Sequence, residues 1–167
     1  TYTAGGLNPP VKFMYIQPSF KFGGECSIEI YMKVISIPNW SRVYRWSNTD
    51  GQDIVWARYD DNDQYYITMA KTGGKYFDCP IVSGQFDHIV FTVTSDGTGK
   101  LYYNGSLQET ETGITIYGEN TVNGSTDACI GCYNYQQRGT NIQFKYLRYY
   151  HGKVLSQSEV DDLYNDR

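Results

Sequence analysis

Two glutamates at the start of the most regular apolar pattern are the only carboxylates whose spacing approaches that of a hydrolytic pair. Glu25 and Glu29 are four residues apart, so a strand would place both side chains on one face. Hydrolysis of a glycosidic bond needs two carboxyl groups across a cleft, one as acid and one as base or nucleophile. The pair lacks an Asp between its members, and we interpret Glu29 as a solvent-face residue of a strand.

The two histidines of the sequence give no second route to catalysis. His88 and His151 lie outside any recognisable nucleophile motif, so no Ser-His-Asp arrangement can be argued. The sequence therefore predicts a protein that is not an enzyme.

Four cysteines could bind a metal, form disulfides or remain thiols. Cys129 and Cys132 form a C-x-x-C motif, but Cys26 and Cys79 each stand alone, and a tetrahedral zinc site needs a second pair of ligands. We predict no metal here. Two disulfides formed in an oxidising compartment are favoured, with their connectivity open and free thiols as the alternative.

An acidic stretch between two strand patterns is the one candidate for a calcium site. Asp60, Asp61 and Asp63, with Asn62 among them, could supply the oxygen ligands that Ca²⁺ prefers. The same four polar residues are what a hairpin turn requires, and no EF-hand Gly and Glu follow. We predict a turn and no cofactor, with calcium as the alternative.

Two kinds of polar site could involve sugars. Acceptor sequons for N-linked glycans begin at Asn39, Asn104 and Asn123, each near an expected turn. A loop-like stretch combines aromatic rings with amides and a guanidinium, groups that stack on sugar rings and bond their hydroxyls. It is the predicted ligand-contact surface and consists of Tyr133, Asn134, Tyr135, Gln136, Gln137 and Arg138.

Composition excludes two classes of partner. The 167 residues carry a net charge of −4 without a basic stripe, so nucleic acid is not expected as a partner. No apolar run approaches the ~18 residues of a membrane span. The sequence begins at Thr1 without a methionine, as a chain does after removal of a signal peptide, so we expect a mature extracellular protein.

The elements that must position these residues are mostly strands. Ile28, Ile30, Met32 and Val34 alternate with polar residues, which is the period of a half-buried strand. Turn signals such as Asn104-Gly105 separate further segments rich in β-branched and aromatic residues. These strand candidates are 12–15, 42–46, 54–59, 64–70, 86–94, 100–103, 108–112, 129–133 and 142–150.

One helix is expected, and it lies at the end of the sequence. Ser156 and Glu159 have the spacing of a capping box. Leu155, Val160 and Leu163 form an apolar stripe beside it, so we expect the helix to cover one edge of a sheet.

Five segments in order resemble the laminin-G-like family of concanavalin A-like jelly rolls. They are Cys26–Lys33, Phe86–Val93, Gly99–Leu107, Ile130–Gly131, and Phe144–Tyr150 with Leu155–Val160. Phe86 replaces the usual Trp and Lys145 replaces a frequent Gly. Glycosidases of this fold carry an E-x-D-x-x-E strand that the sequence lacks.

The resemblance implies an all-β, two-sheet antiparallel jelly-roll sandwich with a short C-terminal helix. Residues 11–167 would form this laminin-G-like jelly-roll domain. Its expected core includes Ile28, Ile30, Met32, Ile89, Phe91, Val93 and Leu147. The fold alone does not give a function, because it hosts lectins, adhesion modules, filament subunits and hydrolases.

Residues 1–10 are expected to form an extended arm, since they contain Gly and Pro pairs and few apolar residues. Such an arm could add a strand to the sheet edge of another copy. The favoured hypothesis is a non-catalytic extracellular glycoprotein that self-assembles into a fibre or coat. The alternative is a lectin-like adhesion module that binds carbohydrate or protein. The assembly contacts would come from Tyr2, Leu7, Asn8, Pro9 and Pro10.

Overall fold

The computed structural model describes residues 14–15, 20–36, 42–47, 53–58, 65–69, 75–114, 120–122, 128–130 and 141–167. These residues form strands and one helix. In chain order they are β1 (Met14–Tyr15), β2 (Phe20–Phe22), β3 (Cys26–Ser36), β4 (Arg42–Ser47), β5 (Asp53–Arg58), β6 (Tyr65–Met69), β7 (Lys75–Cys79), β8 (Phe86–Val93), β9 (Gly99–Tyr103), β10 (Ser106–Glu111), β11 (Asn120–Val122), β12 (Ala128–Ile130), β13 (Asn141–His151) and α1 (Gln157–Asn165).

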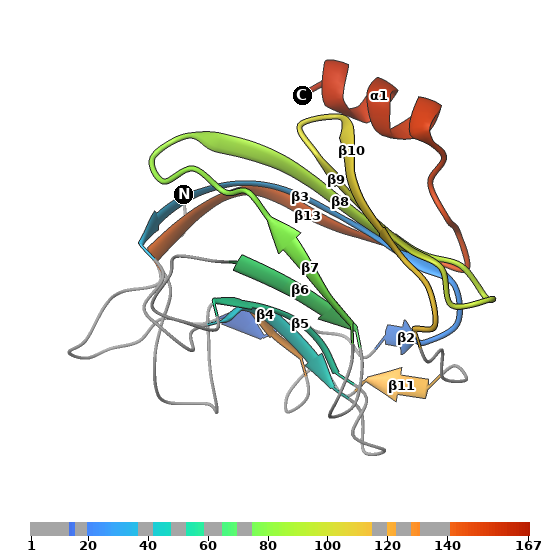
Figure 1. Ribbon diagram of the computed structural model, residues 1–167. Coiled ribbons are helices and arrows are strands. Elements are labelled where there is room, and N and C mark those ends of the chain that lie inside the picture. Colours follow the sequence, from blue (N-terminus) through green and yellow to red (C-terminus); the bar gives the residue numbers. More distant parts are fainter. Residues whose placement is uncertain are drawn as a thin grey trace.

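Two antiparallel sheets lie face to face, with α1 on the far side of one of them (Figure 1). The six-stranded sheet has the order β1-β12-β4-β5-β6-β7, and the five-stranded sheet has the order β10-β9-β8-β3-β13. A short ribbon of β2 and β11 lies apart from both. The all-β antiparallel sandwich with a C-terminal helix is thereby confirmed.

The core between the sheets follows the alternation of β3 and β8. Ile28, Ile30 and Met32 point inward and are each 1% exposed, because every second side chain of a strand shares a face. Across the sandwich the ring of Phe91 meets that of Phe77 edge-on at 5.0 Å between centroids. All predicted core residues are buried except Leu147, which is partly buried and packs against the same cluster.

Three strands were not expected from the sequence: β2, β7 and β11. Among the described strands, β7 forms an edge of the six-stranded sheet and pairs only with β6. Its five residues include Lys75 and Asp78, and charged residues are typical of a protected edge strand. They also weaken the apolar alternation by which a strand is recognised.

The outer face of the five-stranded sheet, turned away from the six-stranded sheet, is also covered. Val160 of α1 and Leu155 before it form a buried cluster with Val90 of β8 and Tyr102 of β9. Figure 1 shows α1 over this face. The expectation that the helix covers a sheet edge was therefore wrong: Val90 and Tyr102 make this face apolar enough to bury the stripe. The predicted capping box of Ser156 and Glu159 is present.

The turn between β9 and β10 depends on two residues with positive φ. Asn104 has φ of 49° and Gly105 has φ of 83°, as the predicted two-residue hairpin requires. The turn packs beneath α1, since a Cβ on Gly105 would lie 3.0 Å from Cδ1 of Tyr164.

Candidate functional site

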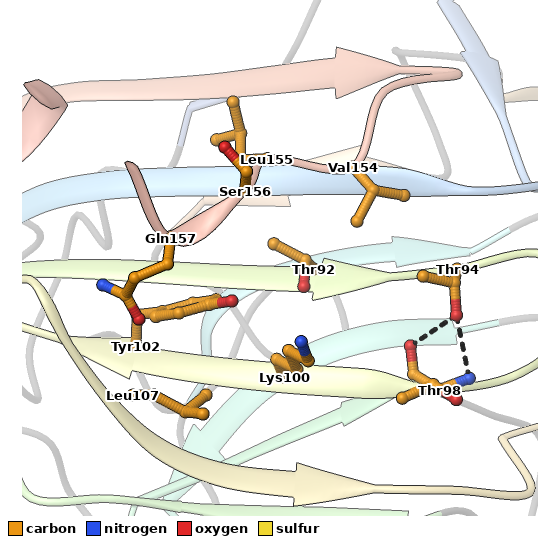
Figure 2. Close-up of a pocket in the computed structure, with 10 residues that line it drawn as sticks. All are labelled: Thr92, Thr94, Thr98, Lys100, Tyr102, Leu107, Val154, Leu155, Ser156 and Gln157. Carbon is orange, nitrogen blue, oxygen red and sulfur yellow. Dashed lines mark hydrogen bonds between the residues drawn. The ribbon is translucent and has the colours of Figure 1, made fainter. Parts of the chain in front are cut away.

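A groove of about 440 Å³ opens on the outer face of the five-stranded sheet (Figure 2). Strands β8 and β9 form its floor, and the segment that leads into α1 forms one wall. We call it the outer-face groove. Its lining consists of Thr92, Thr94, Thr98, Lys100, Tyr102, Leu107, Val154, Leu155, Ser156 and Gln157.

The pairing of β8 with β9 brings three polar side chains together on the floor. Thr92 is the direct partner of Lys100, and Tyr102 is the next residue of β9 on the same face. No hydrogen bond within the described residues satisfies the Thr92 hydroxyl, the Lys100 ammonium or the Tyr102 hydroxyl. Thr92 and Tyr102 are 1% and 3% exposed, so only a small part of each side chain reaches the groove, whereas Lys100 is partly exposed.

Each end of the groove is held by its own hydrogen bonds. At one end the Thr94 hydroxyl donates to the carbonyl of Thr98 at 3.0 Å and accepts from the Thr98 amide at 3.1 Å. At the other end the Gln157 amide nitrogen donates to the Gly105 carbonyl at 2.8 Å and to Asp161 at 2.7 Å. Figure 2 shows Gln157 close to Tyr102. The walls are thus fixed before any ligand binds.

The chemistry of this lining is that of recognition. Hydroxyl, amide and ammonium groups bond to hydroxyls, while Leu107 and Val154 offer apolar contact. Burial, followed by the charge of Asp161, raises the pKa of Tyr102, so its hydroxyl stays protonated at neutral pH. The lining contains no carboxylate or histidine.

A buried charge network lies on the same outer face, around Glu29. Its carboxylate accepts a hydrogen bond from the Tyr150 hydroxyl at 2.6 Å, from Nε2 of His88 at 3.1 Å and from Nη1 of Arg148 at 3.2 Å. Burial would raise the pKa of Glu29, but these hydrogen bonds and the Arg148 charge outweigh it and lower the pKa to about 2.

The interpretation of Glu29 as a solvent-face residue is wrong in one respect. The strand does turn Glu29 away from the core between the sheets, but its side chain is 0% exposed. His88 is likewise fully buried, and its ring lies 5.9 Å from that of Tyr164 on α1. A substrate has no access to this pair, so the network stabilises the fold.

The cysteines with described side chains carry free thiols. Cys26 and Cys79 are both buried in the core between the sheets. Burial raises the pKa of Cys26 to about 12, and it raises that of Cys79 as well, so both thiols stay protonated. The side chain of Cys129 and all of Cys132 lie outside the described residues, and a disulfide between these two stays a prediction.

Asn104 is the one predicted glycosylation site within the described residues, and its side chain already forms hydrogen bonds. The Asn104 amide oxygen accepts from the backbone N–H of His88 at 2.9 Å, and its nitrogen donates to Asp87 at 3.3 Å. An N-linked glycan would have to be attached to this same nitrogen, and the turn packs against Tyr164. We therefore interpret the Asn104 side chain as a group that stabilises the turn.

The other predicted site residues lie outside the described residues. They are the arm residues Tyr2, Leu7, Asn8, Pro9 and Pro10, the sequons at Asn39 and Asn123, the acidic Asp60, Asp61 and Asp63, and the stretch Tyr133, Asn134, Tyr135, Gln136, Gln137 and Arg138. Within the described part of the chain, no three His, Cys, Asp or Glu residues gather closely enough to hold a metal ion. No described helix is long and apolar enough to cross a membrane.

Residues 11–161 match the family model of the concanavalin A-like lectin/glucanase superfamily. The chain belongs to this superfamily. No curated protein matches it by sequence.

Solved structures show the same fold at low identity. Domain 4 of an extracellular arabinanase from Geobacillus stearothermophilus, in complex with arabinotriose, is 20% identical with a TM-score of 0.64 and 84% of this chain covered. A heptameric pentraxin from Limulus polyphemus is 15% identical, with a TM-score of 0.68 and 91% covered. The botulinum neurotoxin serotype D binding domain, in complex with N-acetylneuraminic acid, is 14% identical, with a TM-score of 0.61 and 93% covered.

This superfamily member matches only part of each of these chains. The aligned region spans 66% of the arabinanase domain, 74% of the pentraxin and 39% of the toxin domain. At such identities the likeness concerns the fold.

Proposed function

We propose that this chain is a non-catalytic, lectin-like module of the extracellular space that binds a short stretch of neutral glycan in the outer-face groove. The observation that carries the proposal is the set of unpartnered polar groups on the groove floor: Thr92, Lys100 and Tyr102. Sugar hydroxyls both donate and accept hydrogen bonds, and such a mixed lining serves both roles.

Structures of similar fold give a second argument for sugar binding. Two of the similar structures were solved with a sugar bound, arabinotriose in one and N-acetylneuraminic acid in the other. The groove also lacks the two carboxyl groups that glycoside hydrolysis requires. Binding without turnover is what this lining favours.

Titration calorimetry with neutral trisaccharides of arabinose, galactose, xylose and glucose tests the proposal. We expect at least one to bind, and we expect Thr92→Val or Lys100→Gln to weaken it by about three- to tenfold, the value of one lost hydrogen bond. Thr110→Val on β10 is the matched control, because Thr110 is exposed and outside the groove. The proposal is contradicted if no trisaccharide binds, or if both groove variants bind with the affinity of the unchanged chain.

Self-assembly through the arm is a second proposal, favoured by the exposed edge of the five-stranded sheet. Among the described strands, β10 pairs with β9 on one side only, and most of its side chains are exposed. Its free edge offers backbone groups to a strand from another copy. Light scattering should show larger particles for the whole chain than for a chain without residues 1–10, and equal sizes would contradict it.

A further inference from the structure

A second polar surface lies on the outer face of the five-stranded sheet, at the opposite end of the strands from the groove. We call it the cation–aromatic face. Strand pairing assembles it: Tyr31 of β3 lies opposite Tyr146 of β13, and Lys33 lies opposite Phe86 of β8. Its six residues are Tyr31, Lys33, Phe86, Lys145, Tyr146 and Arg167.

The aromatic rings form a continuous row across three strands. The centroid of Tyr31 lies 5.3 Å from that of Phe86 and 5.8 Å from that of Tyr146. All three side chains are partly exposed. A β-bulge between Phe144 and Tyr146 brings Lys145 into the same group.

Cations are held above these rings. The ammonium groups of Lys33 and Lys145 lie 5.0 and 5.4 Å from the centroid of Phe86. The guanidinium of Arg167 lies 5.6 Å from the centroid of Tyr31 and 3.3 Å from that of Tyr164. Ring faces attract cations, so these flexible side chains lose less freedom when they bind a ligand.

The positive charge of this face is not compensated. Within the described residues, Lys33, Lys145 and Arg167 form no ion pair with a carboxylate. Arg148, which stacks on Tyr146 at 4.1 Å, differs because Glu29 neutralises it. Two ammonium groups over one ring repel each other, and the chain as a whole carries a net charge of −4. An anionic ligand would relieve this local repulsion.

We propose that the cation–aromatic face binds an acidic polysaccharide of the uronic acid class. Successive carboxylates would pair with Lys33, Lys145 and Arg167, and the Tyr31 hydroxyl, which has no hydrogen-bond partner among the described residues, would bond a sugar hydroxyl. A nucleic acid fits less well, because three cations in a net acidic chain do not form the basic stripe that tracks a phosphate backbone.

The test uses the whole chain and two probes that differ only in charge. A hexamer of galacturonic acid is compared with the same hexamer after methyl esterification of its carboxylates, by titration calorimetry at low and high salt. We expect the acid form to bind, its affinity to fall with added salt, and the ester to bind weakly or not at all. Equal binding of the ester overturns the proposal.

Variants locate the binding. Lys33→Gln with Lys145→Gln should weaken the galacturonate hexamer about fivefold or more, while Lys153→Gln, which removes an exposed lysine paired with Glu159 instead, should have no effect. Thr92→Val should also have no effect on binding of the hexamer. The variants therefore test the cation–aromatic face separately from the outer-face groove. Loss of binding only in the groove variant, or tighter binding of a single-stranded DNA of equal charge, overturns the proposal. Melting temperatures verify that each variant is folded.

Discussion

The carboxylate of Glu29 and Nε2 of His88 lie 3.1 Å apart, and both side chains are fully buried on the outer face of the five-stranded sheet. Arg148 and Tyr150 complete the network from β13. Three neighbouring strands are thereby linked through side chains as well as through backbone pairing. A buried charge is stable only when it is paired, so removal of one partner should be costly.

Glu29→Gln should lower the free energy of unfolding by about 3 kcal/mol at neutral pH. The amide keeps the size of the side chain, but it replaces a fully buried carboxylate that accepts from His88, Tyr150 and the half-exposed Arg148, and unsatisfied buried polar groups are costly, more so where a charge is involved. Urea unfolding followed by circular dichroism measures the loss. Glu25→Gln is the matched control, because Glu25 lies outside the network. Equal losses in both variants would contradict the assignment.

The native chain and the Glu29→Gln variant should also differ in how their stability depends on pH. The pKa of Glu29 in the folded chain is about 2, below its ordinary value of 4.5. The ionised form therefore stabilises the fold fully above the ordinary pKa, and this contribution is lost as the pH falls through the folded pKa. The stability difference between the native chain and Glu29→Gln should shrink steadily from about pH 5 to about pH 2. A constant difference would rule out the lowered pKa.

Phe91→Ala should test the core between the sheets. Phe91 is 1% exposed and contacts Phe77 across the sandwich, so truncation leaves a cavity and should cost about 3–5 kcal/mol. Ile35→Ala on β3 is the control, because Ile35 is 41% exposed and should change stability by less than about 0.5 kcal/mol. Chemical denaturation of both variants measures the contrast.

Ser156→Ala should loosen α1. The Ser156 hydroxyl accepts from the Glu159 amide at 3.3 Å, and the Glu159 carboxylate accepts from the Ser156 amide at 2.8 Å. Loss of such a cap costs about 1 kcal/mol. Ser158→Ala, inside the helix and outside the box, is the matched control. Hydrogen exchange at the Val160 amide should accelerate in the first variant and stay unchanged in the second.

Alternation along the chain was sufficient to predict the core of the sandwich. Ile28, Ile30 and Met32 repeat every second residue, and the strand they form faces the other sheet as expected. The opposite face of the same strand could not be predicted in this way. Glu29 looks like a surface residue in the sequence, but its carboxylate is bonded by Arg148 and Tyr150 of β13, which come more than a hundred positions later.

The groove was missed for a related reason. Thr92, Lys100 and Gln157 are separated in the sequence and meet only through strand pairing and the return of the chain to the outer face. The sequence did contain a signal: Lys100 and Tyr102 share a strand face, and the Asn104-Gly105 hairpin was predicted next to them. Alternation alone places polar residues on the outward face of a strand in solvent, whereas here they line a groove.

Asn104 gives a final test, at the junction of the turn, the sheet and the helix. Its amide nitrogen donates to Asp87, which is 1% exposed and also accepts from the Tyr103 hydroxyl at 2.7 Å. Asn104→Asp keeps the shape of the side chain but turns a donor into a second acceptor facing Asp87. We expect a loss of about 1–3 kcal/mol, the cost of an unsatisfied buried polar group.

Asn165→Asp is the control for this change, because Asn165 is exposed at the end of α1 and should tolerate the same substitution. Peptide mapping of protein secreted from a eukaryotic host adds a second measurement. Because a glycan at Asn104 would have to displace the contact with Asp87 and fit beneath Tyr164, we expect that position to be unmodified. A fully glycosylated Asn104 in a folded chain of unchanged melting temperature would show that the turn does not need this amide.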